Sequence, residues 1–272
     1  MRTDLTATQL EQYRRDGFIV IPDALTPSEL EQMRVAVDDS VAKLGNRRIV
    51  DAEIAWADDS SRYDDYYAKV FTQRLMLHRL NDFLRSFFLA PDLGRMMCEL
   101  EGIDGIRMWH DQALIKEPWG NPTAWHLDNP YWSFTSRHAI SIWIALDDAT
   151  FQNGCLYFQP GSHREAEHER NVGITQDFGG LFRAYPEWAS RQPVAAPMKA
   201  GSCSFHNGLT AHGAGANCTP GRRRAMTCGY LPDGCTYNGQ TNVLPPTYLQ
   251  TLKVGDLLNN DKQNPLLWRR PA

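Results

Sequence analysis

The chain of 272 residues lacks the features of membrane, secreted and peroxisomal proteins. No apolar run approaches the roughly 18 residues that a membrane-spanning helix needs. The first residues do not contain the apolar core of a secretion signal, and the last three, Arg270-Pro271-Ala272, are not a peroxisomal address. The sequence therefore predicts a protein of the cytoplasm that has no membrane partner.

A strong charge of either sign is also lacking. Lys and Arg together number 28 and Asp and Glu 32, which gives a formal net charge of −4. Binding to nucleic acid requires a clustered basic face, and the only dense basic cluster is Arg222-Arg223-Arg224. We therefore expect no nucleic-acid partner.

Paired cysteine motifs are missing as well. None of the six cysteines forms a C-x-x-C pair or a zinc-finger spacing, so they predict reduced and mostly buried thiols. Hydrophobic residues make up 42% of the chain and charged residues 22%, as in ordinary globular proteins. The length allows a full hydrophobic core, and we expect one domain that is a monomer or a homodimer.

The pattern of the first hundred residues is mainly helical. Capping-box patterns at Thr6 and Thr26 predict two helices that end at Gly17 and Gly45. The predicted helices span residues 6–16, 26–44, 72–89 and 91–100. Residues 51–69 mix acidic and aromatic side chains without periodicity, which predicts a long loop, either a binding segment or a solvated linker.

Most strand patterns follow after Gly102. One predicted strand, 18–21, lies between the first two helices, and the others span residues 106–116, 123–128, 139–146, 154–159, 201–205 and 225–231. A polar segment, 164–197, interrupts them as an insertion with some helix. The pattern predicts helices packed on an antiparallel barrel or sandwich. The predicted domain has a mainly helical part (1–101), a strand core (102–231) and a C-terminal tail (232–272).

The segment Trp125-His126-Leu127-Asp128 contains the first sign of chemistry. In an extended strand, alternate residues point to the same face, so His126 and Asp128 could converge on one ion. They would supply two thirds of the 2-His-1-carboxylate set that holds non-haem iron(II). The alternative is a surface His and Asp beside the turn at Pro130.

A third ligand has to come from elsewhere in the chain. We expect His78, His163 and His168 to be exposed, and His110, His138 and His206 to be core or rim residues. His212 differs because small residues surround it in Gly208-Leu209-Thr210-Ala211-His212-Gly213-Ala214-Gly215. Arg223 follows eleven residues later, at the start of a predicted strand, where its planar fork could bind a carboxylate.

Together these motifs resemble one known family. His126-x-Asp128, His212-Gly213-x-Gly215-x-Asn217 and Arg223 are similar to the motifs of the phytanoyl-CoA dioxygenase family of iron(II)/2-oxoglutarate-dependent oxygenases. The segments 141–148, 153–156 and 160–163 add to the resemblance, which extends from about residue 10 to residue 231. It implies a mainly β protein with a double-stranded β-helix (jelly-roll) core and N-terminal helices packed against it.

The resemblance also implies a site. Its residues would be His126, Asp128 and His212 as iron ligands, Arg223 as partner of the distal carboxylate of 2-oxoglutarate, and Trp143, Gln112 and Lys116 as further lining of the co-substrate pocket. The implied reaction consumes 2-oxoglutarate and O2, releases succinate and CO2, and oxidises a C–H bond of a small molecule. Halogenating relatives have a small residue in place of the carboxylate, so Asp128 favours hydroxylation. Expected substrate contacts are Asn129, Tyr131, Trp132 and Tyr66.

Two other functions use the same residues. A zinc-dependent hydrolase accepts the same His/Asp/His ligands, but it does not explain Arg223. A non-catalytic jelly-roll binding protein would have lost its metal, yet all three expected ligands are present.

Overall fold

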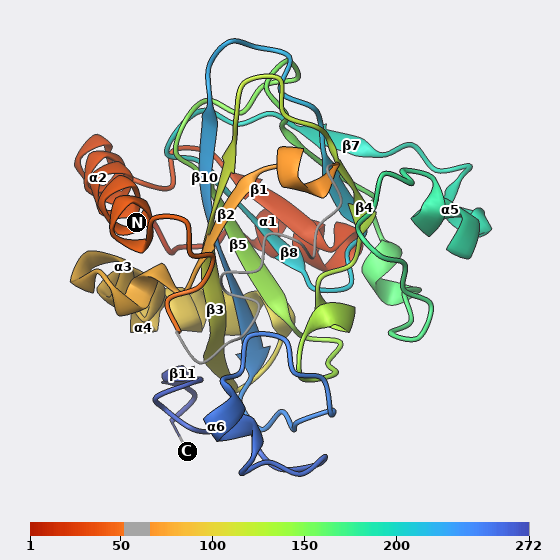
Figure 1. Cartoon of the computed structure of the whole chain (residues 1–272). Helices are drawn as coiled ribbons and strands as arrows, with labels where there is room; N and C mark the ends of the chain where they lie inside the picture. Colours follow the sequence, from red (N-terminus) through yellow and green to blue (C-terminus); the bar gives the residue numbers. More distant parts are fainter. Residues whose placement is uncertain (52–65, 272) are drawn as a thin grey trace.

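Two antiparallel β-sheets form the centre of the protein (Figure 1). The structure is a computed structural model that describes residues 1–51 and 66–271. The larger sheet has the strand order β1-β8-β5-β10-β3-β11, and β2 also pairs with β3. Its strands are β1 (Phe18–Ile21), β2 (Thr72–Leu75), β3 (Gly105–Lys116), β5 (Ile140–Ala145), β8 (Cys203–Asn207), β10 (Arg223–Pro232) and β11 (Leu266–Arg269). This arrangement confirms the expected jelly-roll core.

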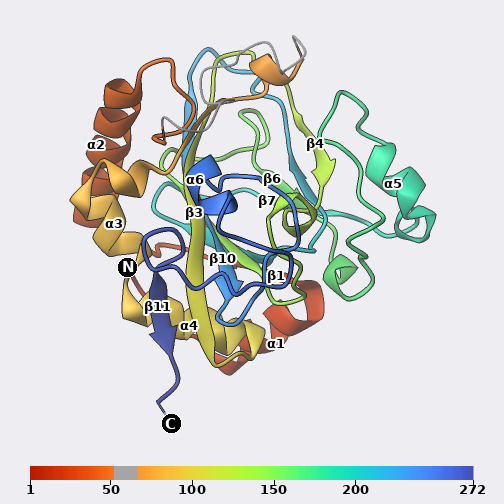
Figure 2. The same cartoon turned by 60° about the horizontal axis from the view of Figure 1, so that its bottom comes forward.

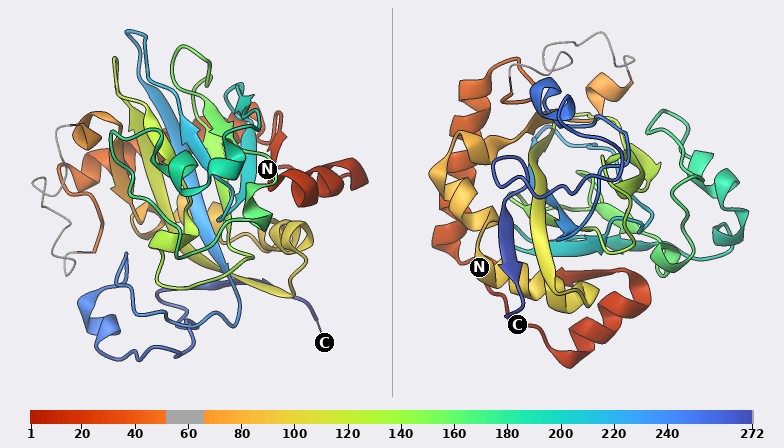
Figure 3. Two further views of the ribbon diagram at one scale, coloured as in Figure 1. Left: turned by 90° about the vertical axis from the view of Figure 1, so that its right-hand side faces the viewer. Right: turned by 90° about the horizontal axis from the view of Figure 1, so that it is seen from below.

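The smaller sheet faces the larger one across the cavity described below. Its order is β4-β9-β6-β7. The strands are β4 (Thr123–His126), β6 (Leu156–Phe158), β7 (Val194–Ala196) and β9 (His212–Ala214). The helix α5 (Gly180–Ala184) lies beside this sheet, on the side of the molecule opposite the helices α2 (Pro27–Leu44) and α3 (Asp82–Phe88) (Figure 3).

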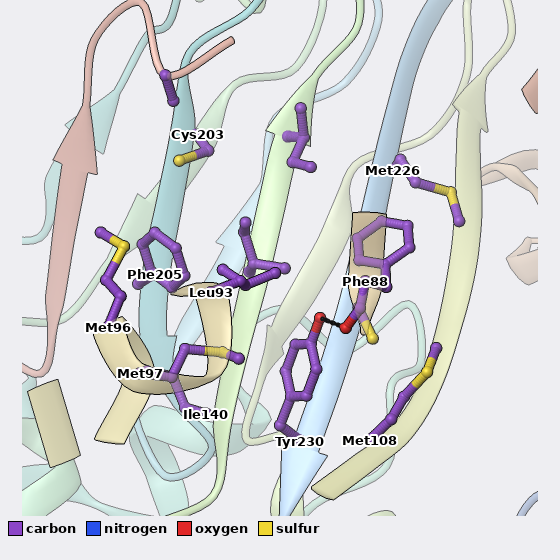
Figure 4. Packing of buried hydrophobic residues seen from close by; sticks show 14 of the residues in the cluster. Phe88, Leu93, Met96, Met97, Met108, Ile140, Cys203, Phe205, Met226 and Tyr230 are labelled. Atoms are coloured by element: carbon purple, nitrogen blue, oxygen red, sulfur yellow. Dashed lines mark hydrogen bonds between the residues drawn. The ribbon is translucent and has the colours of Figure 1, made fainter. Parts of the chain in front are cut away.

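Four N-terminal helices cover the outer face of the larger sheet. They are α1 (Ala7–Asp16), α2 (Pro27–Leu44), α3 (Asp82–Phe88) and α4 (Pro91–Glu101). Alternation along β5 explains this layer, because Ile140, Ile142 and Ile144 pack against the helices while Trp143 and Ala145 belong to a separate cluster on the inner face. Figure 4 shows the outer cluster, in which the Tyr230 hydroxyl donates a hydrogen bond to the Phe88 carbonyl. The main hydrophobic core thus lies between the helices and the outer face of the larger sheet, and the inner face of the sheet lines the cavity.

Most of the predicted elements are confirmed. Thr6 and Thr26 each form a complete capping box at the start of α1 and α2. The predicted helix over 72–89 is wrong in its first part, because Thr72–Leu75 is strand β2 and pairs with β3. Only its second part becomes helical, as a 3-10 turn and α3. Pairing with a long neighbouring strand here overrides the local helical pattern.

Besides β2, three further short strands were not predicted. β7 lies within the predicted insertion, β9 begins at His212, and β11 belongs to the C-terminal tail. The tail, which includes the helix α6 (Pro246–Leu249), folds back across one end of the sheets before β11 pairs with β3 (Figure 2). The tail therefore reaches the same end of the molecule as the loop after β4.

Candidate functional site

Three potential metal ligands converge between the two sheets. His126 ends β4 and lies opposite His212, the first residue of β9. His126 Nε2 lies 3.6 Å from Asp128 Oδ1, and His212 Nε2 lies 3.7 Å from the same oxygen. One ligand atom from each residue lies within 4.8 Å of the others. Such a cluster has the size and donor set of a 2-His-1-carboxylate metal site.

The backbone conformation that brings Asp128 beside His126 differs from the predicted strand. The strand ends at His126, and Asp128 has helical backbone angles (φ −78°, ψ −54°). Its N–H donates to the Gly208 carbonyl at 3.0 Å, which ties the turn to the segment before His212. A turn, rather than an extended strand, thus brings Asp128 beside His126.

Backbone carbonyls orient both imidazoles. His126 Nδ1 lies 2.8 Å from the Ala124 carbonyl, and His212 Nδ1 lies 2.9 Å from the Thr210 carbonyl. A carbonyl oxygen can only accept, so each Nδ1 carries the hydrogen and each Nε2 presents its lone pair to the centre. Burial lowers the pKa of both rings, which favours the neutral form that binds metals.

The second oxygen of Asp128 is occupied by two hydrogen-bond donors. Asp128 Oδ2 accepts from Ser141 Oγ at 2.8 Å and from His206 Nε2 at 3.2 Å. Ser141 and His206 lie opposite each other in the pairing of β5 with β8. Burial by itself would raise the pKa of Asp128, but the neighbouring His212, His206 and His126 together lower it. The carboxylate is therefore ionised, and Oδ1 is the oxygen that faces the two imidazoles.

A cavity of about 720 Å³ contains this cluster. Both sheets line it, and within residues 1–51 and 66–271 its only formally charged lining residues are Asp128 and Arg223. Arg223 is 2% exposed, and its guanidinium carbon lies 5.2 Å from the centre of the Trp143 ring. Burial lowers the pKa of Arg223 to about 10, and its Nε and Nη1 have no hydrogen-bond partner. A buried cation with unpaired donors is costly unless an anion binds to it.

Gln112 also lines the cavity, and its neighbour in the lining, Gln73, together with Arg48 sets the orientation of its amide. Arg48 Nη2 donates to Gln73 Oε1 at 2.6 Å, and Gln73 Nε2 donates to Gln112 Oε1. An arginine can only donate, so the polarity of both amides is determined. The Nε2 of Gln112 is the end of the amide that remains as a donor, which suits an anionic oxygen.

The structure does not bring every predicted site residue to the cavity. Trp143, Gln112, Tyr131 and Trp132 line it, as do the proposed metal ligands and Arg223. The other three predicted residues, Lys116, Asn129 and Tyr66, do not.

Each of these three side chains has partners in the protein. Lys116 lies opposite Arg223, and its Nζ donates to the Asn121 carbonyl at 2.5 Å. Burial and the charge of Arg223 lower the pKa of Lys116 to about 6. Asn129 is fully buried and holds its own loop through the Phe134 carbonyl and the Ser136 N–H, and the Tyr66 hydroxyl donates to the Pro122 carbonyl.

Three histidine predictions need correction, and a fourth histidine has a role that was not predicted. His78 was expected to be exposed but is buried, because its Nδ1 contacts Asp111 on the outer side of β3. His206, expected only as a core or rim residue, lines the cavity and contacts Asp128. His163 and His168 are half-buried rather than exposed. Period-two alternation in the segment Cys203–Asn207 was the only signal that could have pointed to His206.

Comparison with known proteins is decisive at this point. The family model described as "Phytanoyl-CoA dioxygenase (PhyH)" matches residues 13–225. The chain belongs to the phytanoyl-CoA dioxygenase family. Members of this family use iron(II) and 2-oxoglutarate, so the protein is a non-haem iron(II)- and 2-oxoglutarate-dependent dioxygenase.

Curated relatives cover most of the chain. Phytanoyl-CoA dioxygenase domain-containing protein 1 from Mus musculus is 23% identical, over 89% of this chain and 96% of its own length. Ectoine dioxygenase from Halomonas elongata is 28% identical, over 80% of this chain and 68% of its own length.

Solved structures share the fold over nearly the whole chain. The non-haem α-ketoglutarate-dependent carbocyclase SnoK from nogalamycin biosynthesis is 27% identical, with a TM-score of 0.78 over 97% of both chains. The epimerase SnoN, solved with Fe3+, α-ketoglutarate (2-oxoglutarate) and nogalamycin RO, is 26% identical, with a TM-score of 0.75 over 96% of this chain and 97% of its own.

Proposed function

We propose that His126, Asp128 and His212 hold iron(II), and that 2-oxoglutarate binds between this metal and Arg223. One observation carries the proposal: a His/Asp/His cluster and a buried guanidinium with unpaired donors line the same cavity. The cluster supplies the donors that iron(II) takes in such sites, and the guanidinium supplies a fork for a carboxylate. The residues present therefore fit both groups.

The side chains around the site have distinct tasks. When bound, iron and 2-oxoglutarate supply the oxidising chemistry, with release of succinate and CO2. Arg223, beside Trp143, binds and orients the distal carboxylate. Gln112 donates from Nε2 to the co-substrate. Asp128 offers Oδ1 to the metal while Oδ2 stays hydrogen-bonded.

We further propose that the enzyme hydroxylates, or otherwise oxidises, a C–H bond of a small-molecule metabolite. A carboxylate at position 128 occupies the place that a halide needs, which favours hydroxylation over halogenation. The related SnoK and SnoN, a carbocyclase and an epimerase of nogalamycin biosynthesis, support an organic small molecule as substrate.

The remaining proposals concern partners and location. No helix in the described part of the chain is long and apolar enough to cross a membrane. We propose that the enzyme acts in the cytoplasm, without a membrane partner, as a monomer or homodimer. The small net charge supports the absence of a nucleic-acid partner.

A spectroscopic experiment tests the metal centre. Iron(II) and 2-oxoglutarate, added without oxygen, should give a weak visible charge-transfer band, and His126→Ala should abolish it. The two other functions predict different results. A zinc hydrolase would need no 2-oxoglutarate, and a non-catalytic binding protein would release no succinate. A well-folded wild-type protein without the band would refute the iron site.

A further inference from the structure

The cavity extends beyond the part that the metal and the co-substrate would occupy. Along β10, Arg223 lies opposite Lys116 and Gly229 lies opposite His110. The two positions are six residues apart along the strand, or roughly 20 Å. Trp132 lies at the Gly229 end, where a Cβ on Gly229 would come within 2.8 Å of the indole, and its ring lies 6.1 Å from His110. This end is therefore remote from Arg223.

Segments from four parts of the chain line this end of the cavity. We call it the outer chamber and define it by the lining residues His110, Tyr131, Trp132, Ile174, Asn242 and Val243. The C-terminal tail is held against the loop after β4, because Asn238 Nδ2 donates to the Trp132 carbonyl at 3.0 Å. Val243 packs in the same apolar cluster as Trp132. The tail is thus a fixed wall of the chamber.

The described walls of the outer chamber carry no formal charge. Asp128 and Arg223, the charged residues that line the cavity, are assigned to the metal and to 2-oxoglutarate. His110 is buried, and burial lowers its pKa to about 4, so its imidazole is neutral near pH 7. A substrate carboxylate or phosphate would find no cation there among the described residues, and a substrate ammonium would find no free anion.

Two buried polar atoms of the chamber lack partners. His110 Nδ1 and Asn242 Oδ1 are buried, and neither has a partner with hydrogen-bond geometry. The hydroxyl of Tyr131, in contrast, already donates to the Val172 carbonyl at 2.6 Å. Native proteins leave few buried polar atoms unpaired, and such atoms in a binding cavity indicate contacts that the ligand completes. An amide oxygen only accepts, so the group that pairs with Asn242 has to be a donor.

We propose that the substrate is an uncharged, hydroxyl-bearing ring compound. Its ring packs on the apolar wall formed by Trp132, Ile174 and Val243, and its hydroxyl groups bond to His110 Nδ1 and Asn242 Oδ1. A hydroxyl can donate to Asn242 Oδ1, and it can pair with His110 Nδ1 as donor or as acceptor, in either tautomer of the ring. This inference rests on the proposed function, because it assumes that Asp128 and Arg223 are occupied by the metal and the co-substrate.

A screen of matched compounds tests the charge requirement. Each ring skeleton is offered as an alcohol, a carboxylate and an amine to wild-type enzyme loaded with iron(II) and 2-oxoglutarate. Binding is read without oxygen as a shift of the charge-transfer band, and turnover is read in air as succinate release. Alcohols should give the responses. Responses from carboxylates or amines only, or from no alcohol, would overturn the inference.

Variants of the two polar residues test the contacts. His110→Phe keeps a ring of similar size, and Asn242→Ala removes the amide. Each should raise the KM of the best alcohol about 10-fold and leave the charge-transfer band without substrate unchanged. For the analogue that lacks the bonded hydroxyl, the same variants should leave KM within about twofold. His138→Phe, on the surface, is the matched control and should leave KM within twofold for both compounds.

The results distinguish failure of the proposed iron and 2-oxoglutarate site from failure of the proposed substrate contacts. If the band fails to form in the wild type, the proposed function fails. If the band forms and responds to alcohols, but both chamber variants keep the wild-type KM, only the assigned contacts fail.

Discussion

Replacing Arg223 tests the co-substrate site most directly. Its Nε and Nη1 have no partner in the protein, so two charge-assisted hydrogen bonds are available to a carboxylate. Each is worth about 1.5–3 kcal/mol. Arg223→Met, which keeps much of the side-chain volume, should therefore weaken 2-oxoglutarate binding by about 3–6 kcal/mol, or roughly 10²- to 10⁴-fold in Kd.

Iron binding and stability should respond differently to the same change. Arg223 makes no hydrogen bond to the His/Asp/His cluster, so the Kd for iron(II) should change by less than about threefold. The variant also removes a buried cation without a hydrogen-bonded partner for two of its nitrogens. We therefore expect the Tm without 2-oxoglutarate to be unchanged or higher than in the wild type.

Titration calorimetry or the charge-transfer band measures both affinities, and a thermal scan measures Tm. Arg222→Met is the matched control, because the Arg222 side chain is 51% exposed and its guanidinium pairs with Asp38 at the surface. The control should bind 2-oxoglutarate like the wild type. Equal losses of iron and 2-oxoglutarate affinity in Arg223→Met, or an unchanged 2-oxoglutarate Kd, would refute the assigned role.

Three further predictions concern polar contacts. Gln73→Glu offers Gln112 an acceptor in place of a donor and should reverse the amide of Gln112. The KM for 2-oxoglutarate should therefore rise about 10-fold, and more than in Gln73→Met. Equal effects of the two variants would contradict the proposal that Gln73 orients the Gln112 amide. Ser141→Ala removes one of two donors to the proposed carboxylate ligand and should weaken iron(II) binding about 10-fold in a chelator competition, with an unchanged Tm; unchanged iron affinity would count against it. Asp147→Asn should lower the free energy of unfolding by about 1–3 kcal/mol near pH 7, because Arg224 donates to this carboxylate at 2.7 Å. Burial would raise the pKa of Asp147, but Arg224 lowers it below the usual 3.8. The ionised Asp147 therefore stabilises the folded state above pH 4. In denaturant titrations, the difference in the free energy of unfolding between Asp147→Asn and wild type should shrink as the pH falls below 4.

Local signals determined much of the fold. The capping boxes at Thr6 and Thr26 involve residues three positions apart, and the predicted helices α1 and α2 are confirmed. The long strands β3, β5 and β10 were likewise predicted from period-two patterns. Helix caps and alternation depend on neighbours in the sequence, so the sequence contains the information needed to predict them.

Long-range pairing decided the elements that were missed. Thr72–Leu75 has a helical pattern but pairs with β3, and β9 and β11 are too short to be recognised without their partners. His78 is buried in contact with Asp111, which lies on a strand 33 residues later. Such contacts depend on strand register, which a pattern read along one segment does not contain.

Some residues of the site were likewise predicted from the sequence, whereas others were brought together only by the fold. His126, Asp128, His212 and Arg223 stood out in the sequence because their spacing resembles a known family. The role of His206 as a donor to Asp128 was decided by the register of β5 with β8, which sets it opposite Ser141. The walls of the outer chamber likewise come from segments as distant as residues 110 and 243, so only the folded chain brings them together.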